Sequence, residues 1–303
     1  MRRRPYLAIA MAVVCVSFAA IFITWSESPP ITVALYRLGF ASLILFPVAL
    51  LHSERPLRRV DRKGTLLMTG VGAILATHFA LWITSLKTQG VTVASSVILV
   101  TSHPLLVGLL SHFVVRERLN WQGAVGIVLG FSGVLVIAAG DYRVSTITLV
   151  GDVLAFLGGV MAGFYFLAGR RIRRQIPLLG YAFVVYASAT GVLFVYAVAL
   201  GQSLVPTGDA PRELLLFLAL AIIPQIGGHT LYNWSLRYVS ASVVSLSLVG
   251  EPIGSSLLAW VLLSQVPSLA VAFGGTLALG GIYLTLMGET TRTRQVAATR
   301  DVE

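Results

Sequence analysis

The feature that most constrains the fold of this chain is a series of apolar stretches, each long enough to cross a lipid bilayer as a helix. Such a helix needs about 20 mostly apolar residues. The chain is 56% hydrophobic and 11% charged, whereas a soluble domain carries about 25% charged residues. We therefore predict an all-α membrane protein with ten transmembrane helices. These helices are expected at about residues 6–25, 32–52, 65–86, 92–115, 121–139, 148–168, 179–200, 213–236, 240–263 and 268–287.

The distribution of Lys and Arg predicts the orientation of these helices. If the N-terminus is cytoplasmic and the spans alternate, 18 of the 22 basic residues fall in cytoplasmic segments and three in outer segments, while Arg37 lies within a span. Lys and Arg are enriched in cytoplasmic loops, so both termini are expected in the cytoplasm, with residues 289–303 as a tail. The net charge of +10 lies in short clusters between apolar runs. This pattern argues against a nucleic acid as partner.

The two halves of the chain echo each other at matching places in the span pattern. The echoes pair WITSLK at 82–87 with YNWSLR at 232–237, His103-Pro104 with Glu251-Pro252, and Gly126 and Gly133 with Gly274 and Gly281.

These echoes predict two five-helix repeats, at residues 1–140 and 141–288. Because five is odd, the second repeat must enter the membrane from the opposite side to the first. The repeats are therefore expected to be inverted, with a pseudo-two-fold axis in the membrane plane. This arrangement is typical of transporters, in which two halves move about a site held between them.

Three short motifs accompany the ten-helix pattern: Gly250-Glu251-Pro252 followed by LLAWVLL at 257–263, RLGFA at 37–41, and LRY at 236–238. Together they resemble the EamA family of the drug/metabolite transporter superfamily, over about residues 6–287. The resemblance implies a ten-helix transporter, but its motifs do not identify the substrate. The family often has a Glu near the end of both the fourth and the ninth span. Glu117 fits the first of these positions, but Gln265 occupies the second.

Polar side chains at bilayer depth are costly without a partner or a wet cavity, so they mark candidate binding positions. In the third span His78, Trp82 and Ser85 share one helical face, and in the eighth Gln225 and His229 share a face with Tyr232 or Asn233. The third and eighth spans are repeat mates, as are the fourth and ninth, which predicts one central cavity. The residues expected to bind substrate there are His78, Trp82, Ser102, His103, Tyr165, His229, Tyr232, Asn233 and Glu251.

Glu251 is the strongest single candidate among them. Its carboxylate is suited to bind a substrate amine, or to take up a proton that couples transport to a gradient. The alternative is that it bonds to neighbouring helices and only stabilises the fold, and the histidines have the same alternative. Arg37 either attracts a substrate carboxylate or, as is more usual, pairs with carbonyls or extends toward the outer face.

Pro104 and Pro252 occupy matching positions in the two halves. Each removes a backbone donor and frees a carbonyl one turn earlier, which kinks a helix. We expect a hinge or the wall of a wet cavity at each proline, the alternative being a packing kink.

The motif content favours transport over catalysis, because HExxH, GxSxG and GxxxxGK[ST] are missing from the sequence. The single cysteine, Cys15, leaves no Cys-based metal site, and no metal or cofactor is expected. The predicted function is a secondary transporter of the bacterial inner membrane that moves an amino acid or related amphipathic metabolite by alternating access. Export is implied by the family resemblance.

Three points stay open. Protons are a further candidate partner beside the small-molecule substrate and the lipid bilayer, and the oligomeric state is undetermined. An intramembrane enzyme acting on lipid-borne substrates is one alternative function. A membrane scaffold or receptor that transports nothing is the other.

Overall fold

The computed structural model describes residues 4–51, 62–106, 120–172, 176–235, 238 and 247–300, and all regular structure within these ranges is helical. Eight described segments are long and apolar enough to cross a membrane: Arg4–Trp25, Pro30–Leu51, Arg62–Leu86, Trp121–Asp141, Thr146–Gly169, Leu178–Ala199, Ala210–Ser235 and Leu269–Gly288. By length and composition these are the helices of a multi-pass membrane protein.

Two shorter apolar helices, Val93–Leu106 and Gly250–Leu263, fall in the predicted fourth and ninth spans. Residues 107–115 and 240–246 of those spans lie outside the described ranges, as does Glu117.

The described helices of the first half are α1 (Arg4–Ser17), α2 (Ala19–Trp25), α3 (Pro30–Leu51), α4 (Arg62–Leu86), α5 (Val93–Val100) and α7 (Trp121–Val144), and residues 103–106 after α5 are helical as well. The second half forms α8 (Thr146–Ile172), α9 (Leu178–Ala199), α10 (Ala210–Leu220), the π-helical η2 (Ala221–Thr230), α11 (Leu231–Ser235), α13 (Gly250–Leu263) and α14 (Leu269–Arg300).

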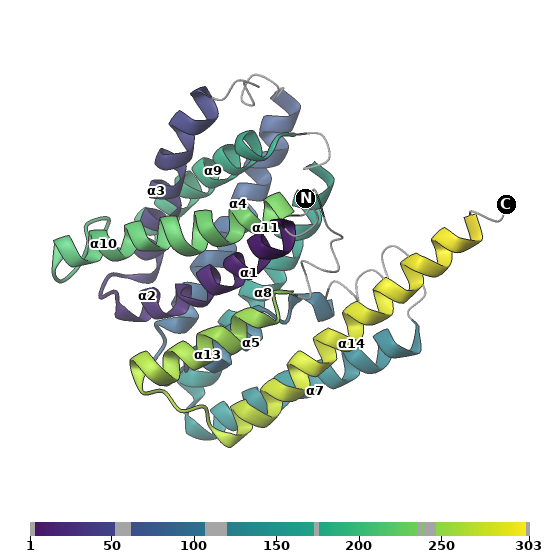
Figure 1. Ribbon diagram of the computed structural model, residues 1–303. Coiled ribbons are helices and arrows are strands. Elements are labelled where there is room, and N and C mark those ends of the chain that lie inside the picture. The colour runs from purple at the N-terminus through teal and green to yellow at the C-terminus, as the bar shows by residue number, and fades with distance from the viewer. Residues whose placement is uncertain are drawn as a thin grey trace.

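The two halves are interleaved. Helix α3 packs on α9, α4 packs on both α8 and α9, α1 packs on η2 and α13, and α5 packs on α8 and α13. Figure 1 shows α7 and α14 lying along each other at one edge of the bundle. Each half therefore buries much of its apolar surface against the other.

Glycines bring α7 and α14 into close contact. A Cβ built on Gly126 would lie 2.7 Å from the carbonyl oxygen of Gly281, and one built on Gly274 would lie 2.8 Å from that of Gly133. The two helices are thus antiparallel, and the side chain of any other residue would separate them.

Two helices continue beyond their predicted spans. The fifth span was expected to end near residue 139, but α7 runs on to Val144, and only Ser145 separates it from α8. Asp141 is buried within α7, and its carbonyl accepts a hydrogen bond of 3.1 Å from the Ser145 N–H. Likewise, α14 extends as a helix to Arg300, through most of the predicted tail.

Candidate functional site

Arg37 lies in α3 and is fully buried. Its Nε donates a hydrogen bond of 2.9 Å to Oε1 of Gln225 in η2, and its guanidinium carbon lies 4.2 Å from the centroid of the Phe79 ring in α4. The terminal nitrogens Nη1 and Nη2 have no hydrogen-bond partner within the described part of the chain. Arg37 therefore does not extend toward the outer face, and the carbonyl oxygen that it pairs with belongs to the side-chain amide of Gln225.

Phe79 belongs to a group of ring side chains on α4, together with His78 and Trp82. Nδ1 of His78 is 2.8 Å from the carbonyl oxygen of Gly158 in α8, and the His78 ring stacks on Trp82 with centroids 6.1 Å apart. Phe79 meets the ring of His229 edge-on, at 5.9 Å. Phe79 thus contacts both Arg37 and His229, and so links α3 to α4 and η2.

A second set of contacts joins α8 and α11 to His103, which lies in the helical residues that follow α5. Nδ2 of Asn233 donates to the His229 carbonyl at 2.9 Å and lies 3.4 Å from the hydroxyl of Tyr165. Phe166 packs on Tyr165 and stacks on His103, with centroids 5.2 Å apart in both pairs. A continuous series of contacts thus runs from α11 through α8 to His103.

Glu251 lies in the first turn of α13 and is 8% exposed. It is within electrostatic range of the Arg37 guanidinium and of Tyr232, yet it forms no ion pair with Arg37. Arg37 and Glu251 are therefore ionisable groups of opposite sign that lie near each other without forming an ion pair.

We call this assembly the interior polar cluster. It comprises Arg37, His78, Trp82, His103, Tyr165, Gln225, His229, Tyr232, Asn233 and Glu251. Eight of the nine predicted binding residues belong to it. Ser102 is the exception, because its hydroxyl bonds to the Leu99 carbonyl of its own helix at 2.7 Å. Their role in binding stays a prediction.

Arg37 and Gln225 were each considered from the sequence, but neither was among the predicted binding residues and their contact was not predicted. The signals for them were a basic residue within an apolar span and the shared polar face of Gln225 and His229. No group of three metal-ligating side chains occurs among the described residues.

Both predicted hinge prolines follow a break in helical structure. Thr101 and Ser102 form a turn between the end of α5 and the helical residues that contain Pro104. Leu248 and Val249 form a turn immediately before α13, which contains Pro252.

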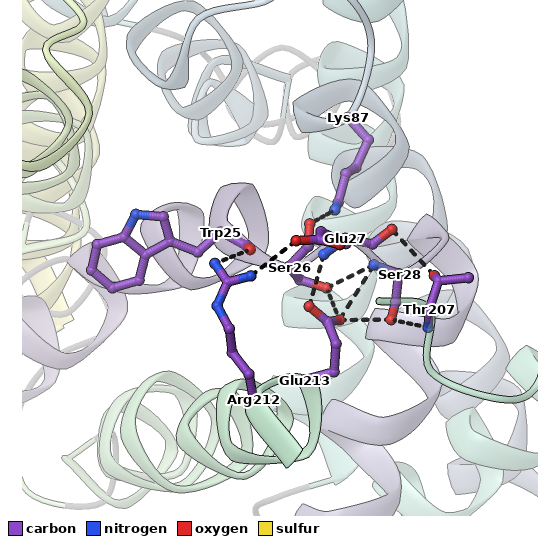
Figure 2. A network of polar contacts seen from close by, with 8 residues as sticks. All are labelled: Trp25, Ser26, Glu27, Ser28, Lys87, Thr207, Arg212 and Glu213. Atoms are coloured by element: carbon purple, nitrogen blue, oxygen red, sulfur yellow. Dashed lines mark hydrogen bonds and ion pairs between the residues drawn. The ribbon is translucent and has the colours of Figure 1, made fainter. Parts of the chain in front are cut away.

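A second polar assembly surrounds Glu213, which is 1% exposed and lies in α10 (Figure 2). Its Oε2 accepts hydrogen bonds of 2.6 Å from the hydroxyls of both Ser26 and Ser28, and its Oε1 accepts one of 2.8 Å from the Glu27 N–H. The Thr207 N–H donates to the Ser28 hydroxyl at 3.1 Å. A carboxylate with this many donors is well compensated for its burial.

Two cations complete this Glu213 network. Arg212 donates to Glu27 at 3.1 Å and to the Trp25 carbonyl at 3.0 Å, while the Lys87 ammonium donates to the Ser26 carbonyl. Burial lowers the pKa of Lys87, and the carboxylates of Glu213 and Glu27 oppose that shift. The network ties the α2–α3 connection and the end of α4 to α10 and the loop before it, so it joins the two halves.

Comparison with known proteins identifies relatives along the whole chain. The family model described as the EamA-like transporter family matches residues 3–139 and 149–287. An uncharacterized transporter of Archaeoglobus fulgidus is 26% identical, covering 92% of this chain and 95% of the relative. A probable terminal-alkyne amino-acid exporter of Streptantibioticus cattleyicolor is 24% identical, covering 86% of this chain and 89% of the relative.

The fold also has a counterpart among solved structures. One crystal structure superimposes with a TM-score of 0.64, covering 94% of this chain and 98% of the other. At 22% sequence identity this likeness concerns the fold alone.

Proposed function

Because this chain belongs to the EamA-like transporter family, we propose that it is a secondary transporter that exports an amino acid or related amphipathic metabolite across the bacterial inner membrane. The observation that carries the proposal is that the interior polar cluster draws its side chains from both halves. The first half contributes through α3, α4 and His103, and the second through α8, η2, α11 and α13. The relative named as a probable amino-acid exporter supports the substrate class.

The proposal includes ten spans in two inverted repeats, and the helix contacts support it. The pairing of α4 with α8 has its counterpart in η2 with α1, that of α4 with α9 in η2 with α3, and that of α5 with α8 in α13 with α1. The glycine contacts are reciprocal as well, because Gly126 faces Gly281 while Gly133 faces Gly274. Reciprocal contacts between equivalent positions are expected about a two-fold axis.

Alternating access requires that the two halves separate first at one end and then at the other. The Glu213 network joins the halves at the end predicted to face outward, so it is suited to close that side. The turns before Pro104 and Pro252 are suited to act as hinges between the closed and open arrangements.

The test is transport by the purified full chain in proteoliposomes. Vesicles loaded with unlabelled leucine, phenylalanine or lysine are placed in the corresponding radiolabelled compound, with and without an imposed proton gradient. We expect saturable counterflow of at least one compound above protein-free vesicles. The Gly191→Ala protein serves as control for preparation quality, because Gly191 is exposed and a Cβ there meets nothing within 4 Å.

Other outcomes point to the alternative functions. Absence of flux for the whole panel contradicts the proposal and favours a scaffold or receptor. Recovery of a labelled compound in a chemically altered form favours an enzyme.

A further inference from the structure

We propose that the two terminal nitrogens of Arg37 form a carboxylate subsite, so that the transported compound carries a carboxylate, and that Glu251 is the resident counter-ion which this carboxylate replaces. The inference rests on the proposed transport function and concerns the same interior polar cluster. It predicts how the compound is oriented in the cluster: its carboxylate lies at Arg37 of α3, on the side opposite Glu251 of α13.

The geometry leaves one edge of the guanidinium for a ligand. Gln225 holds Nε through a hydrogen bond of 2.9 Å, and Phe79 lies under the guanidinium plane at 4.2 Å. These two contacts fix the position of the group and leave Nη1 and Nη2 without a partner. Two parallel N–H donors at this edge match the two oxygens of a carboxylate.

The energetics also call for an anion. Buried polar groups are almost always hydrogen-bonded, and a buried charge with no partner is strongly destabilising. Within the described residues, Glu251 is the one carboxylate in electrostatic range of Arg37, and it makes no direct ion pair. It therefore reduces the cost of the buried charge, while the two Nη donors stay available.

The other buried carboxylates of the described chain lie elsewhere. Glu213 belongs to its own network at the predicted outer end. Asp141 and Asp152 lie close to each other and to Ser95, and neither is in electrostatic range of Arg37. None of the three is suited to replace a ligand at Arg37.

Ligand binding to the purified full chain tests the inference. Binding is followed by thermal stabilisation in detergent with three acid and amide pairs: phenylalanine and phenylalaninamide, leucine and leucinamide, and 3-phenylpropanoate and 3-phenylpropanamide. The third pair lacks the amine and so isolates the carboxylate. We expect at least one acid to bind about tenfold or more tightly than its amide. Equal binding within every pair overturns the inference.

Variants then locate the preference. Arg37→Lys keeps the positive charge but loses the two parallel N–H donors, so acid binding should weaken about tenfold. Arg37→Met loses the charge as well and should abolish the discrimination between acid and amide. Arg143→Met is the matched control, because Arg143 is an exposed arginine at the end of α7, and it should keep the wild-type ratio. A folded Arg37→Met protein that still prefers the acid contradicts the subsite.

Glu251→Gln supplies a test that does not depend on the folding of an Arg37 variant. Removing the resident counter-ion should strengthen acid binding several-fold and leave amide binding unchanged. Weaker acid binding, or no change, contradicts the displacement of Glu251.

Failure of this inference differs from failure of the transport function. Transport of compounds without any preference for a carboxylate would support the transport function and contradict the subsite. Carboxylate binding at Arg37 without flux of any bound compound would support the subsite and contradict the transport function.

Discussion

Glu213 is the residue on which closure of the predicted outer end should depend. Glu213→Gln replaces a carboxylate that accepts hydrogen bonds from both serines with an amide that presents two donors. We expect a loss of about 2–3 kcal/mol in the free energy of unfolding, the usual worth of hydrogen bonds to a buried charge. Denaturation of the purified protein in detergent measures it.

The neighbouring carboxylate provides the control for this prediction. Glu27 is 60% exposed and pairs with Arg212 at the surface, so Glu27→Gln should cost less than about 1 kcal/mol. Equal effects of the two substitutions would show that the donors around Glu213 do not stabilise this conformation.

At the same scale, the sequence predicts buried polar residues better than it predicts their partners. His78, His229 and Asn233 were found because helical spacing places them on the inner faces of their spans. Arg37 and Gln225 belong together through a contact that links α3 to η2, across 188 positions of the chain. Nothing in either span indicates this pairing, because it depends on how the two halves pack.

Among the elements, the contact between α7 and α14 is the one most sensitive to a single methyl group. Gly133→Ala places a Cβ against the backbone of α14 near Gly274 and Ala278. We expect a loss of about 1–3 kcal/mol in stability, as for overpacking of a core. Gly191→Ala, at an exposed position of α9, should instead gain up to about 1 kcal/mol, because Ala favours helix. A similar response of both variants in denaturation would contradict close packing of α7 on α14.

Helical spans were predictable from hydropathy, whereas their local geometry was not. The predicted eighth span is divided into α10, the π-helix η2 and α11. Pro224 lies within η2, where its missing N–H and its ring disturb α-helical hydrogen bonding. The hydroxyl of Thr230 bonds to the carbonyl of Gln225, five residues earlier. A prediction built on the α-helical period does not reproduce this wider turn, which carries both Gln225 and His229.

At the scale of the whole molecule, the interior polar cluster exists only where the two halves meet. The first half supplies α3, α4 and His103 to it, and the second supplies the elements that complete each contact. Since neither half contains the cluster by itself, the first half alone should fail to reproduce the predicted carboxylate binding.

The topology of the membrane spans provides the test for the whole chain. In a Cys15→Ser background, single cysteines replace Arg62 and Arg143, both exposed, in right-side-out spheroplasts. The third, fourth and fifth spans separate these positions, so an impermeant maleimide should label Arg143→Cys at once and Arg62→Cys only after the membrane is opened. Labelling of both from outside would mean that the fourth span does not cross.

The ninth span is tested in the same way by the exposed positions Ser203 and Ser268. The eighth and ninth spans lie between them, so both cysteine variants should react from outside if each span crosses. Reaction of Ser203→Cys alone would leave the second half with four crossings. Helix α14 would then start on the cytoplasmic side, as α7 is predicted to do. The contacts of Gly126 with Gly281 and Gly133 with Gly274 require these two helices to be antiparallel, so this outcome would contradict two halves related by an axis in the membrane plane.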